Sequence, residues 1–128
     1  MNETGKTLLA IEDKLWTGGP DEYRRHLDET CLTVFPGMAS VQKRDEIADM
    51  SKERRWRNVA LDVKDMIEPA PGIAILTYQA RATRGDGKPY EALVSSGYAK
   101  RSDGWKLMFH QQTELDAKAE KRKPAAAE

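Results

Sequence analysis

Apolar residues recur at helical spacing in the first part of the chain. Leu8, Ile11 and Leu15 lie three or four residues apart, which predicts an amphipathic helix over about residues 6–17. A Gly-Gly-Pro sequence follows, and its Pro20 suits the first position of a second, shorter helix. The sequence therefore predicts two consecutive helices at the start of the domain.

The hydrophobic period changes along the rest of the chain. A short strand at 30–35 and a third helix at about 41–54 come first. Alternating apolar residues then predict four long strands, at about 56–68, 72–84, 89–101 and 104–114. This order predicts an α+β fold in which three helices pack on one face of a curved antiparallel sheet.

Two Asp-Gly pairs set the expected register of the last three strands. Asp-Gly favours a two-residue hairpin turn, so we centre the turns on Asp86-Gly87 and Asp103-Gly104. The face toward the helices then carries Ile73, Ile75, Thr77, Val94, Ser96, Tyr98, Trp105, Leu107, Phe109, Gln111 and Thr113. The opposite face carries Leu76, Tyr78, Leu93, Ser95, Gly97, Met108, His110 and Gln112. A one-residue bulge in either hairpin would invert the assignment beyond it.

Polar side chains form a cluster in the middle of the predicted inner face. We expect Thr77, Ser96 and Gln111 to form a polar ring inside an apolar pocket, the usual form of a small-molecule site. Tyr98 lies beside this ring. The alternative is that these side chains only satisfy one another's hydrogen bonds across the strands. His110 is expected to point away from the helices, so Gln111 is the better cavity candidate.

The predicted outer face is too apolar for a sheet surface left in water. It carries Leu76, Tyr78, Leu93 and Met108, and the chain has no further helix to cover them. We therefore expect a homodimer formed through this face, with His110 in or near the interface.

The helical layer adds candidates of its own. Trp16, Tyr23 and His26 are placed to close the mouth of a pocket. The alternative for Trp16 is simple core packing, and the alternative for His26 is a surface or helix-packing histidine. His26 is the only acid or base candidate in that layer. Cys31 on the short strand is interpreted as a small buried hydrophobe rather than a reactive thiol. The scattered His and Cys residues do not form a zinc site, and we expect no metal and no cofactor.

Composition narrows the class of protein. Lys+Arg and Asp+Glu are each 21, so the net charge is zero, and nothing favours nucleic acid or an acidic membrane surface as partner. There is no apolar run long enough to span a bilayer and no signal peptide, so a cytoplasmic location is expected. We expect one domain over residues 1–115 and a charged, Ala-rich disordered tail over 116–128.

The element order resembles the NTF2-like superfamily, also called the cystatin-like α+β cone. More closely, it resembles the SnoaL-like branch, which is related to ketosteroid isomerases and includes domains of unknown function. The sequences that carry the resemblance are LDETCLTVFPG (27–37), RDEIADM (44–50) and GWKLMFHQQT (104–113), and it covers about residues 7–114. It implies three helices on a strongly bent sheet, a cone-shaped pocket between them, and dimerisation through the sheet.

The family's catalytic residues find few counterparts here. The carboxylate base of ketosteroid isomerases falls at Phe35, their oxyanion-hole acid at Ser96, and their helix tyrosine near Trp16. Steroid isomerase chemistry is therefore not expected. The histidine common near the end of the last strand in SnoaL-like sequences aligns with either Gln111 or His110.

Two functions from different classes follow from these observations. The first is a small-molecule-binding domain, with isomerase-, cyclase- or dehydratase-type proton transfer as its possible chemistry and His26 as the acid or base. Its ligand would contact Trp16, Tyr23, Phe35, Thr77, Ser96, Tyr98, Phe109 and Gln111. The second is a non-catalytic dimeric assembly module whose cone is filled by its own side chains. The volume of the pocket discriminates between them: a cavity of a few hundred Å³ favours a ligand.

Overall fold

The protein is described by a computed structural model over residues 1–53 and 56–115. The helices are α1 (Glu3–Thr17), α2 (Pro20–His26) and α3 (Arg44–Met50), followed by the 3-10 turn η1 (Ser51–Glu53). The strands are β1 (Leu27–Phe35), β2 (Met38–Lys43), β3 (Arg57–Ala70), β4 (Ile73–Thr83), β5 (Pro89–Arg101) and β6 (Gly104–Glu114). The tail predicted over 116–128 lies outside the described residues.

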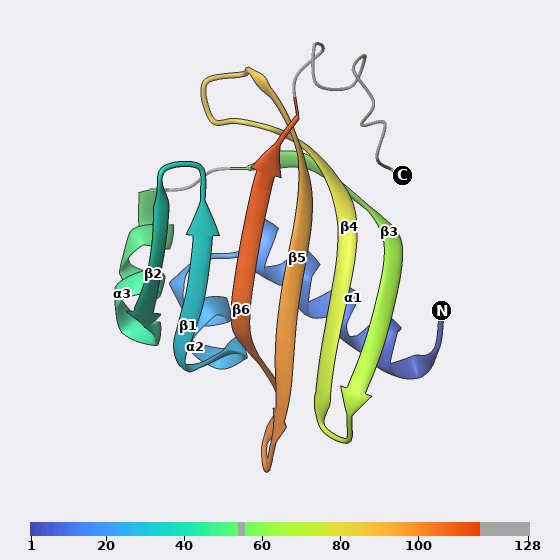
Figure 1. Ribbon diagram of the computed structural model, residues 1–128. Helices are drawn as coiled ribbons and strands as arrows, with labels where there is room; N and C mark the ends of the chain where they lie inside the picture. The colour runs from blue at the N-terminus through green and yellow to red at the C-terminus, as the bar shows by residue number, and fades with distance from the viewer. Residues whose placement is uncertain (54–55, 116–128) are drawn as a thin grey trace.

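The six strands form one sheet in the order β2-β1-β6-β5-β4-β3. Strands β1 and β6 are parallel, and the other neighbouring pairs are antiparallel. Figure 1 shows that the sheet is curved and that the helices lie on one side of it, with α1 crossing behind β3, β4 and β5. The predicted α+β class, with helices on one face of a curved sheet, is confirmed.

Helix α1 begins and ends where its sequence provides caps. The side chain of Asn2 accepts a hydrogen bond from the backbone N–H of Gly5 at 2.8 Å, which satisfies one of the free donors of the first turn. At the other end the Gly18 N–H donates to the Lys14 carbonyl. The apolar face that includes Leu8 is buried against the sheet, as its spacing predicts.

Strand β2 was not predicted from the sequence. The expected third helix at 41–54 begins only at Arg44, because Met38–Lys43 pairs with β1 as the second strand of a hairpin. The turn uses Gly37, whose φ of 85° lies in the left-handed region. The side chains of β2 are exposed or half-buried, with Val41 66% exposed. The strand therefore carries no alternating apolar pattern from which it could be predicted. Helix α3 follows this hairpin and precedes the four long strands, as the sequence predicts.

The turn between β4 and β5 differs from the expected one by one residue. A two-residue turn on Asp86-Gly87 needs a positive φ at both positions, whereas only Gly87 has one, at 90°. Hydrogen bonds instead join the Arg84 N–H to the Lys88 carbonyl and the Gly87 N–H to the Arg84 carbonyl, each at 2.8 Å. The loop therefore has three residues, 85–87, and every side chain of β4 faces the other way from the prediction.

A bulge changes the register between β5 and β6. Arg101 pairs with Gly104, so the two-residue turn lies on Ser102-Asp103 and the expected turn on Asp103-Gly104 is wrong by one residue. Tyr98 then pairs with Leu107, a shift of two residues that keeps both on the inner face as predicted. One residue further along β5, Gly97 pairs with Phe109, so Met108 is an extra residue on β6. Beyond this bulge the faces of β6 are inverted relative to the prediction, so that His110 points inward.

The corrected registers redefine the core. Residues fully or nearly fully buried on the inner face are Ala74, Leu76, Tyr78, Ala80, Ala92, Val94, Ser96, Tyr98 and Leu107. The predicted outward placement of Leu76, Tyr78, His110 and Gln112 is therefore wrong. Ile73, Ile75, Thr77, Phe109, Gln111 and Thr113, expected to face the helices, lie on the opposite face of the sheet.

Candidate functional site

A carboxylate lies in the middle of the hydrophobic core. Glu12 of α1 follows Leu8 by one helical turn, so its side chain projects from the same buried face of the helix. Its residue is only 1% exposed. An ionised group is rarely buried to this extent unless other polar groups compensate for the water it loses.

Three hydroxyl groups of the sheet provide that compensation. The Tyr78 and Tyr98 hydroxyls donate short hydrogen bonds to the two oxygens of Glu12, Oε1 and Oε2 respectively. The Ser96 hydroxyl donates to Oε1 at 2.9 Å. Because β4 and β5 present these hydroxyls side by side on the inner face, the sheet forms a preorganised cradle for one carboxylate.

The hydrogen-bond network continues from Ser96 to His110. The Ser96 Oγ lies 2.8 Å from Nδ1 of His110, and Nε2 of the same ring lies 3.0 Å from the Gln112 amide nitrogen. The Tyr90 hydroxyl donates to the Gln112 carbonyl oxygen, which orients the amide nitrogen toward the ring. This arrangement fits a neutral imidazole that carries its proton on Nδ1 and accepts at Nε2.

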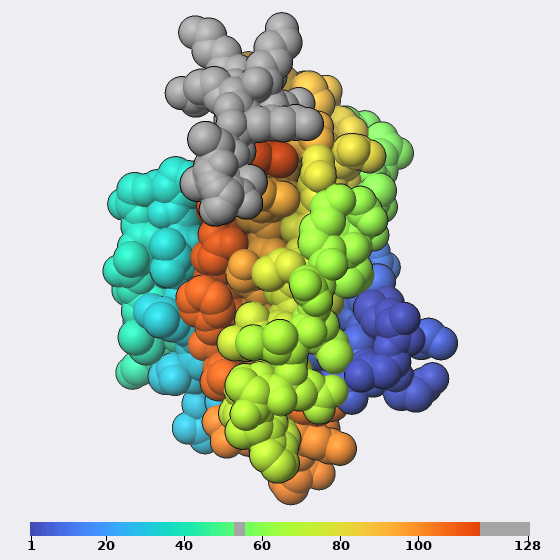
Figure 2. Space-filling view, turned by 45° about the vertical axis from the view of Figure 1, so that its right-hand side comes forward, coloured from blue at the N-terminus to red at the C-terminus, as the bar shows by residue number. Residues whose placement is uncertain are grey.

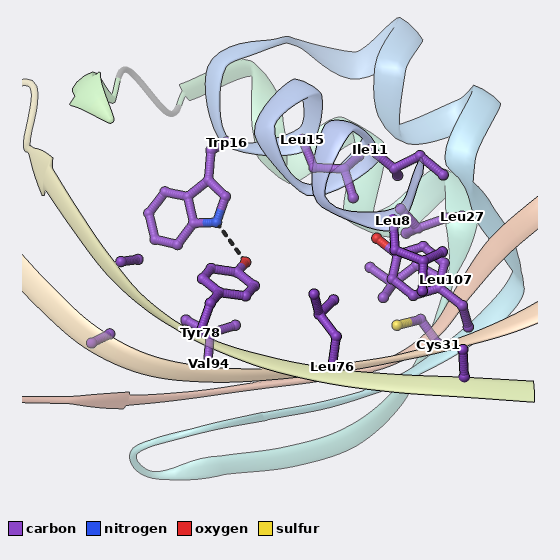
Figure 3. Close-up of a cluster of buried hydrophobic side chains, with 14 of the residues drawn as sticks. Leu8, Ile11, Leu15, Trp16, Leu27, Cys31, Leu76, Tyr78, Val94 and Leu107 are labelled. Atoms are coloured by element: carbon purple, nitrogen blue, oxygen red, sulfur yellow. Dashed lines mark hydrogen bonds between the residues drawn. The ribbon is translucent and has the colours of Figure 1, made fainter. Parts of the chain in front are cut away.

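Aromatic residues extend the network at its other end. The Trp16 indole N–H donates to the Tyr78 hydroxyl at 2.9 Å, the bond drawn in Figure 3. The Trp16 ring also packs edge-on against Trp56, with 5.1 Å between ring centroids, and Trp56 in turn lies 4.8 Å from the Tyr90 ring. The rings of Trp16, Trp56 and Tyr90 thus surround one end of the buried hydrogen-bond network.

This network borders a cavity between the helices and the sheet. The lining residues are Glu12, Leu15, Trp16, Tyr23, Leu27, Cys31, Thr33, Phe35, Gln42, Ile47, Met50, Trp56, Leu107, His110 and Gln112. The space in which the centre of a water molecule fits is about 50 Å³. One water needs roughly 10–15 Å³ on this measure, so the cavity has room for a few waters or one small organic molecule. It is smaller than the few hundred Å³ that would favour a ligand over a self-filled cone, because aromatic side chains fill much of the cone. By volume alone the cavity therefore favours the self-filled alternative, and a ligand is supported instead by the polar groups that border the cavity.

Burial and the Glu12 charge alter the titration of the surrounding groups. Desolvation, followed by the Glu12 charge, raises the pKa of the Tyr78 and Tyr98 hydroxyls well above the usual range, so both stay protonated donors. Desolvation also raises the pKa of the Cys31 thiol to about 12, with a smaller contribution from Glu12. Cys31 is therefore a neutral thiol, which agrees with its interpretation as a small buried hydrophobe.

The structure brings five of the predicted site residues to this region. Trp16, Tyr23 and Phe35 line the cavity, and Ser96 and Tyr98 hold Glu12. Their placement on the inner side of the sheet agrees with the sequence analysis.

Four predicted residues lie elsewhere. Thr77, Gln111 and Phe109 are on the outer face, because of the three-residue β4–β5 loop and the bulge at Met108. Gln111 donates there to Ser95, at 3.1 Å. The expectation that these three residues line the pocket is wrong.

His26 is the fourth, and it does not line the cavity. Its Nε2 lies 3.6 Å from the Glu22 carboxylate on the same helix. Desolvation lowers the pKa of His26, and the nearby Glu22 charge opposes that shift. The expectation that His26 is the acid or base of the pocket loses its geometric basis.

Sequence reasoning missed Glu12, His110 and Gln112 as members of the site. For Glu12 a signal was present, since a carboxylate that continues the spacing of Leu8 and Leu15 lies on the apolar face of the helix. His110 and Gln112 could be assigned to the inner face only if the bulge at Met108 were known, because a shift of one residue exchanges the two faces of a strand.

The described residues contain neither a metal-binding cluster nor a membrane-spanning helix. Within the described part of the chain, no group of three or more His, Cys, Asp or Glu side chains is arranged to hold a metal ion. Among the same residues, no helix combines the length and apolar character needed to cross a bilayer.

Comparison with known proteins identifies the fold. No family model and no curated protein sequence matches the chain. Solved structures do: an uncharacterized cystatin-like-fold protein from Caulobacter vibrioides has a TM-score of 0.71 at 16% identity, over 99% of this chain and 100% of that one. An NTF2-like protein of unknown function from Prochlorococcus marinus has a TM-score of 0.72 at 13% identity, over 91% and 96%.

A third similar structure is a putative Ca/calmodulin-dependent kinase II association domain from Exiguobacterium sibiricum. Its TM-score is 0.65 at 21% identity, over 87% of this chain and 90% of that one. Together these structures show that the chain has the NTF2-like, cystatin-like fold. That fold hosts many functions, so the function has to be argued from the site itself.

Proposed function

We propose that the domain binds one small organic molecule in the cavity beside Glu12 and His110. The observation that carries this proposal is the convergence of a buried carboxylate, a neutral imidazole and an amide on a cavity that is otherwise mostly apolar and aromatic. A few polar groups in an apolar cavity give a ligand its orientation, while the apolar wall supplies most of the affinity. The volume limits the ligand to about the size of a single ring.

Proton transfer to or from the bound molecule is a second proposal, favoured by the His110–Ser96–Glu12 chain. Neutral His110 has a lone pair on Nε2, which a ligand would reach by displacing the Gln112 amide. If Nε2 took a proton from the ligand, Ser96 and Glu12 would stabilise the resulting imidazolium, whose Nδ1 is 4.0 Å from Glu12 Oε1. This chemistry belongs to the isomerase, cyclase or dehydratase type expected from the sequence, with His110 in the place given there to His26.

The binding proposal is tested with two matched variants on β6. Gln112 lines the cavity, whereas its neighbour Gln111 lies on the outer face. A set of one-ring and four-carbon compounds is titrated against the protein, and the indole N–H signals of the tryptophans are followed by NMR. We expect shifts at Trp16 and Trp56, which line the cavity, and smaller ones at Trp105, which does not.

Gln112→Leu should alter these affinities, and Gln111→Leu should leave them unchanged. Cyclohexanone, one of the one-ring compounds, tests proton transfer when it is dissolved in D₂O. Its α-hydrogens should exchange for deuterium faster in the presence of the native protein than in the presence of His110→Gln. Equal effects of the two glutamine variants, or no indole shifts with any compound, would contradict the binding proposal. Equal exchange rates would contradict the second proposal alone.

Assembly is the alternative function, and a specific surface supports it. The outer face of the sheet exposes apolar side chains, with Leu32 and Leu93 each 43% exposed. In Figure 2 the strands β5 and β6 lie on this side between β1 and the forward-standing β3. We propose that a second copy of the chain covers this face. The homodimer expected from the sequence uses a face that carries Leu76, Tyr78 and His110, but these residues lie on the inner side, so the proposal rests on Leu32 and Leu93 instead. A cytoplasmic location also stays a prediction.

Sedimentation velocity tests the dimer. Leu32→Lys and Leu93→Lys should each shift the protein toward a monomer, because a charge would be buried in the interface. Ala10→Lys, on the exposed side of α1, adds the same charge away from the sheet and should leave the dimer intact. A native protein that is monomeric at tens of micromolar would refute this proposal without affecting the cavity.

A further inference from the structure

We infer that the cavity selects a cationic ligand, a small organic ammonium ion with an apolar body. This inference rests on the proposed function, and it adds the chemical class of the ligand. Its basis is the sign of the charge that the cavity contains together with the aromatic character of its wall.

Glu12 supplies the charge. Among the cavity-lining residues that the structure describes, it is the only Asp, Glu, Lys or Arg. A charge this deeply buried is weakly screened by water and salt, so it acts on whatever occupies the neighbouring space. The potential in the cavity is therefore negative unless a nearby group cancels it.

The groups that face Glu12 do not cancel the charge. Tyr78 and Tyr98 remain neutral donors, since burial and the Glu12 charge both oppose their ionisation. Ser96 has no charge to offer. His110, from β6, has Nδ1 4.0 Å from Glu12 Oε1 and would cancel the charge if it were protonated. The orientation of the Gln112 amide, however, places an N–H donor 3.0 Å from Nε2, which requires the neutral ring. Cys31, from β1, is a neutral thiol. With His110 neutral, the groups that the structure describes around Glu12 hold the carboxylate by hydrogen bonds and leave one net negative charge beside the cavity.

Arg84 is a basic side chain beside Tyr90, at the aromatic end of the network. Arg84 lies over the Tyr90 ring, with its guanidinium carbon 4.8 Å from the ring centroid. Its Nη2 is also 3.1 Å from the Glu114 carboxylate, so its charge is paired on the surface. It therefore does not offset the charge of Glu12.

The cavity wall is suited to a cation as well. Trp16, Tyr23, Phe35 and Trp56 all line it. The faces of aromatic rings carry a negative partial charge and attract ammonium groups, tryptophan most strongly. Acceptors for the N–H groups of an ammonium are present too, in His110 Nε2 and the side-chain oxygens of the lining residues. Glu12 would repel an anionic ligand, and a neutral ligand would form no ion pair with it.

The experiment compares ligands of one shape and three charges. Benzylammonium, benzyl alcohol and benzoate share a ring, and isobutylammonium, isobutanol and isobutyrate form a smaller set in case the ring exceeds the cavity. Each is titrated near neutral pH against the full chain, with the Trp16 and Trp56 indole signals as reporters and Trp105 as the internal control. We expect the ammonium ion of at least one set to bind roughly tenfold more tightly than its alcohol.

Glu12→Gln tests the origin of this preference, because it removes the charge and keeps the shape. The affinity ratio of ammonium to alcohol should fall to about one, while binding of the alcohol persists. Circular dichroism checks that the variant folds, and if it does not, the three-charge comparison on the native chain still decides the sign of the preference.

Several outcomes would overturn the inference. An alcohol or a carboxylate that binds as tightly as its ammonium would refute the charge preference and leave the binding proposal standing. A cation preference that survives in folded Glu12→Gln would assign it to another group. Indole signals that respond to no compound in either set would refute the proposed function together with this inference.

Discussion

The hydrogen bond from Tyr98 to Glu12 should contribute more to stability than an ordinary side-chain hydrogen bond. Tyr98 is fully buried, and its hydroxyl donates to Oε2 of Glu12. Among the described residues no other donor reaches that oxygen, whereas Oε1 accepts from both Tyr78 and Ser96. Tyr98→Phe therefore leaves one oxygen of a buried carboxylate without a described donor.

The magnitude follows from the charge of the acceptor. Hydrogen bonds to charged groups contribute about 1.5–3 kcal/mol, and those between neutral groups about 1 kcal/mol. We expect Tyr98→Phe to lower the free energy of unfolding by about 2–3 kcal/mol. Tyr90→Phe is the matched control, since the Tyr90 hydroxyl donates to the neutral amide of Gln112, and it should cost about 1 kcal/mol.

Urea unfolding of the two variants, followed by circular dichroism, measures both losses. A double-mutant cycle with Glu12→Gln isolates the contribution of the charge, because Tyr98→Phe should cost only about 1 kcal/mol in that background. The reasoning would be refuted if Tyr98→Phe cost no more than Tyr90→Phe, or if its cost were the same with Glu12→Gln as without it.

Two further predictions concern pH. The pKa of Cys31 rises from 9.0 to about 12 on folding, so its contribution to stability is complete below pH 9.0 and is lost as the pH rises toward 12, up to about 4 kcal/mol. Cys31→Ala should therefore make the urea midpoint decline less steeply between pH 9.0 and pH 10.0. Above pH 10.0 the ionisation of Tyr78 and Tyr98 adds further losses of stability, so the comparison stops there. A decline that is as steep in the variant as in the native protein would contradict this prediction. The pKa of His26 is instead lowered from 6.5 by desolvation, so stability is complete above pH 6.5 and falls below it, and His26→Gln should reduce the fall in thermal midpoint on acidification. A variant as acid-sensitive as the native protein would show that another group is responsible.

Much of the fold could be predicted because its elements bury regular apolar patterns. The last two strands were expected at 89–101 and 104–114, and they lie at Pro89–Arg101 and Gly104–Glu114. Strand β2 could not be predicted in this way. Its side chains are not buried, and its pairing with β1 is a backbone interaction that leaves no hydrophobic period in the sequence.

The site was harder to predict than the fold, because it depends on single-residue details of the sheet. Asp86-Gly87 does form part of a turn, but Gly87 alone takes the left-handed conformation and the loop is one residue longer than the pair suggests. The bulge at Met108 has no sequence signal comparable to a glycine or proline. Each of these details exchanges the two faces of a strand, which is why His110 and Gln111 were assigned in reverse.

The buried carboxylate is the strongest argument that the cavity has a function. A buried charge held by hydrogen bonds adds little net stability, and in other proteins well-packed apolar replacements of buried ionic groups are often neutral or stabilising. Here three hydroxyls from two strands converge on Glu12, and His110 is linked to it through Ser96. A core that served only to fold the chain would not need this arrangement. A cavity that has to present a fixed negative charge to a ligand does, because water cannot stabilise the carboxylate there.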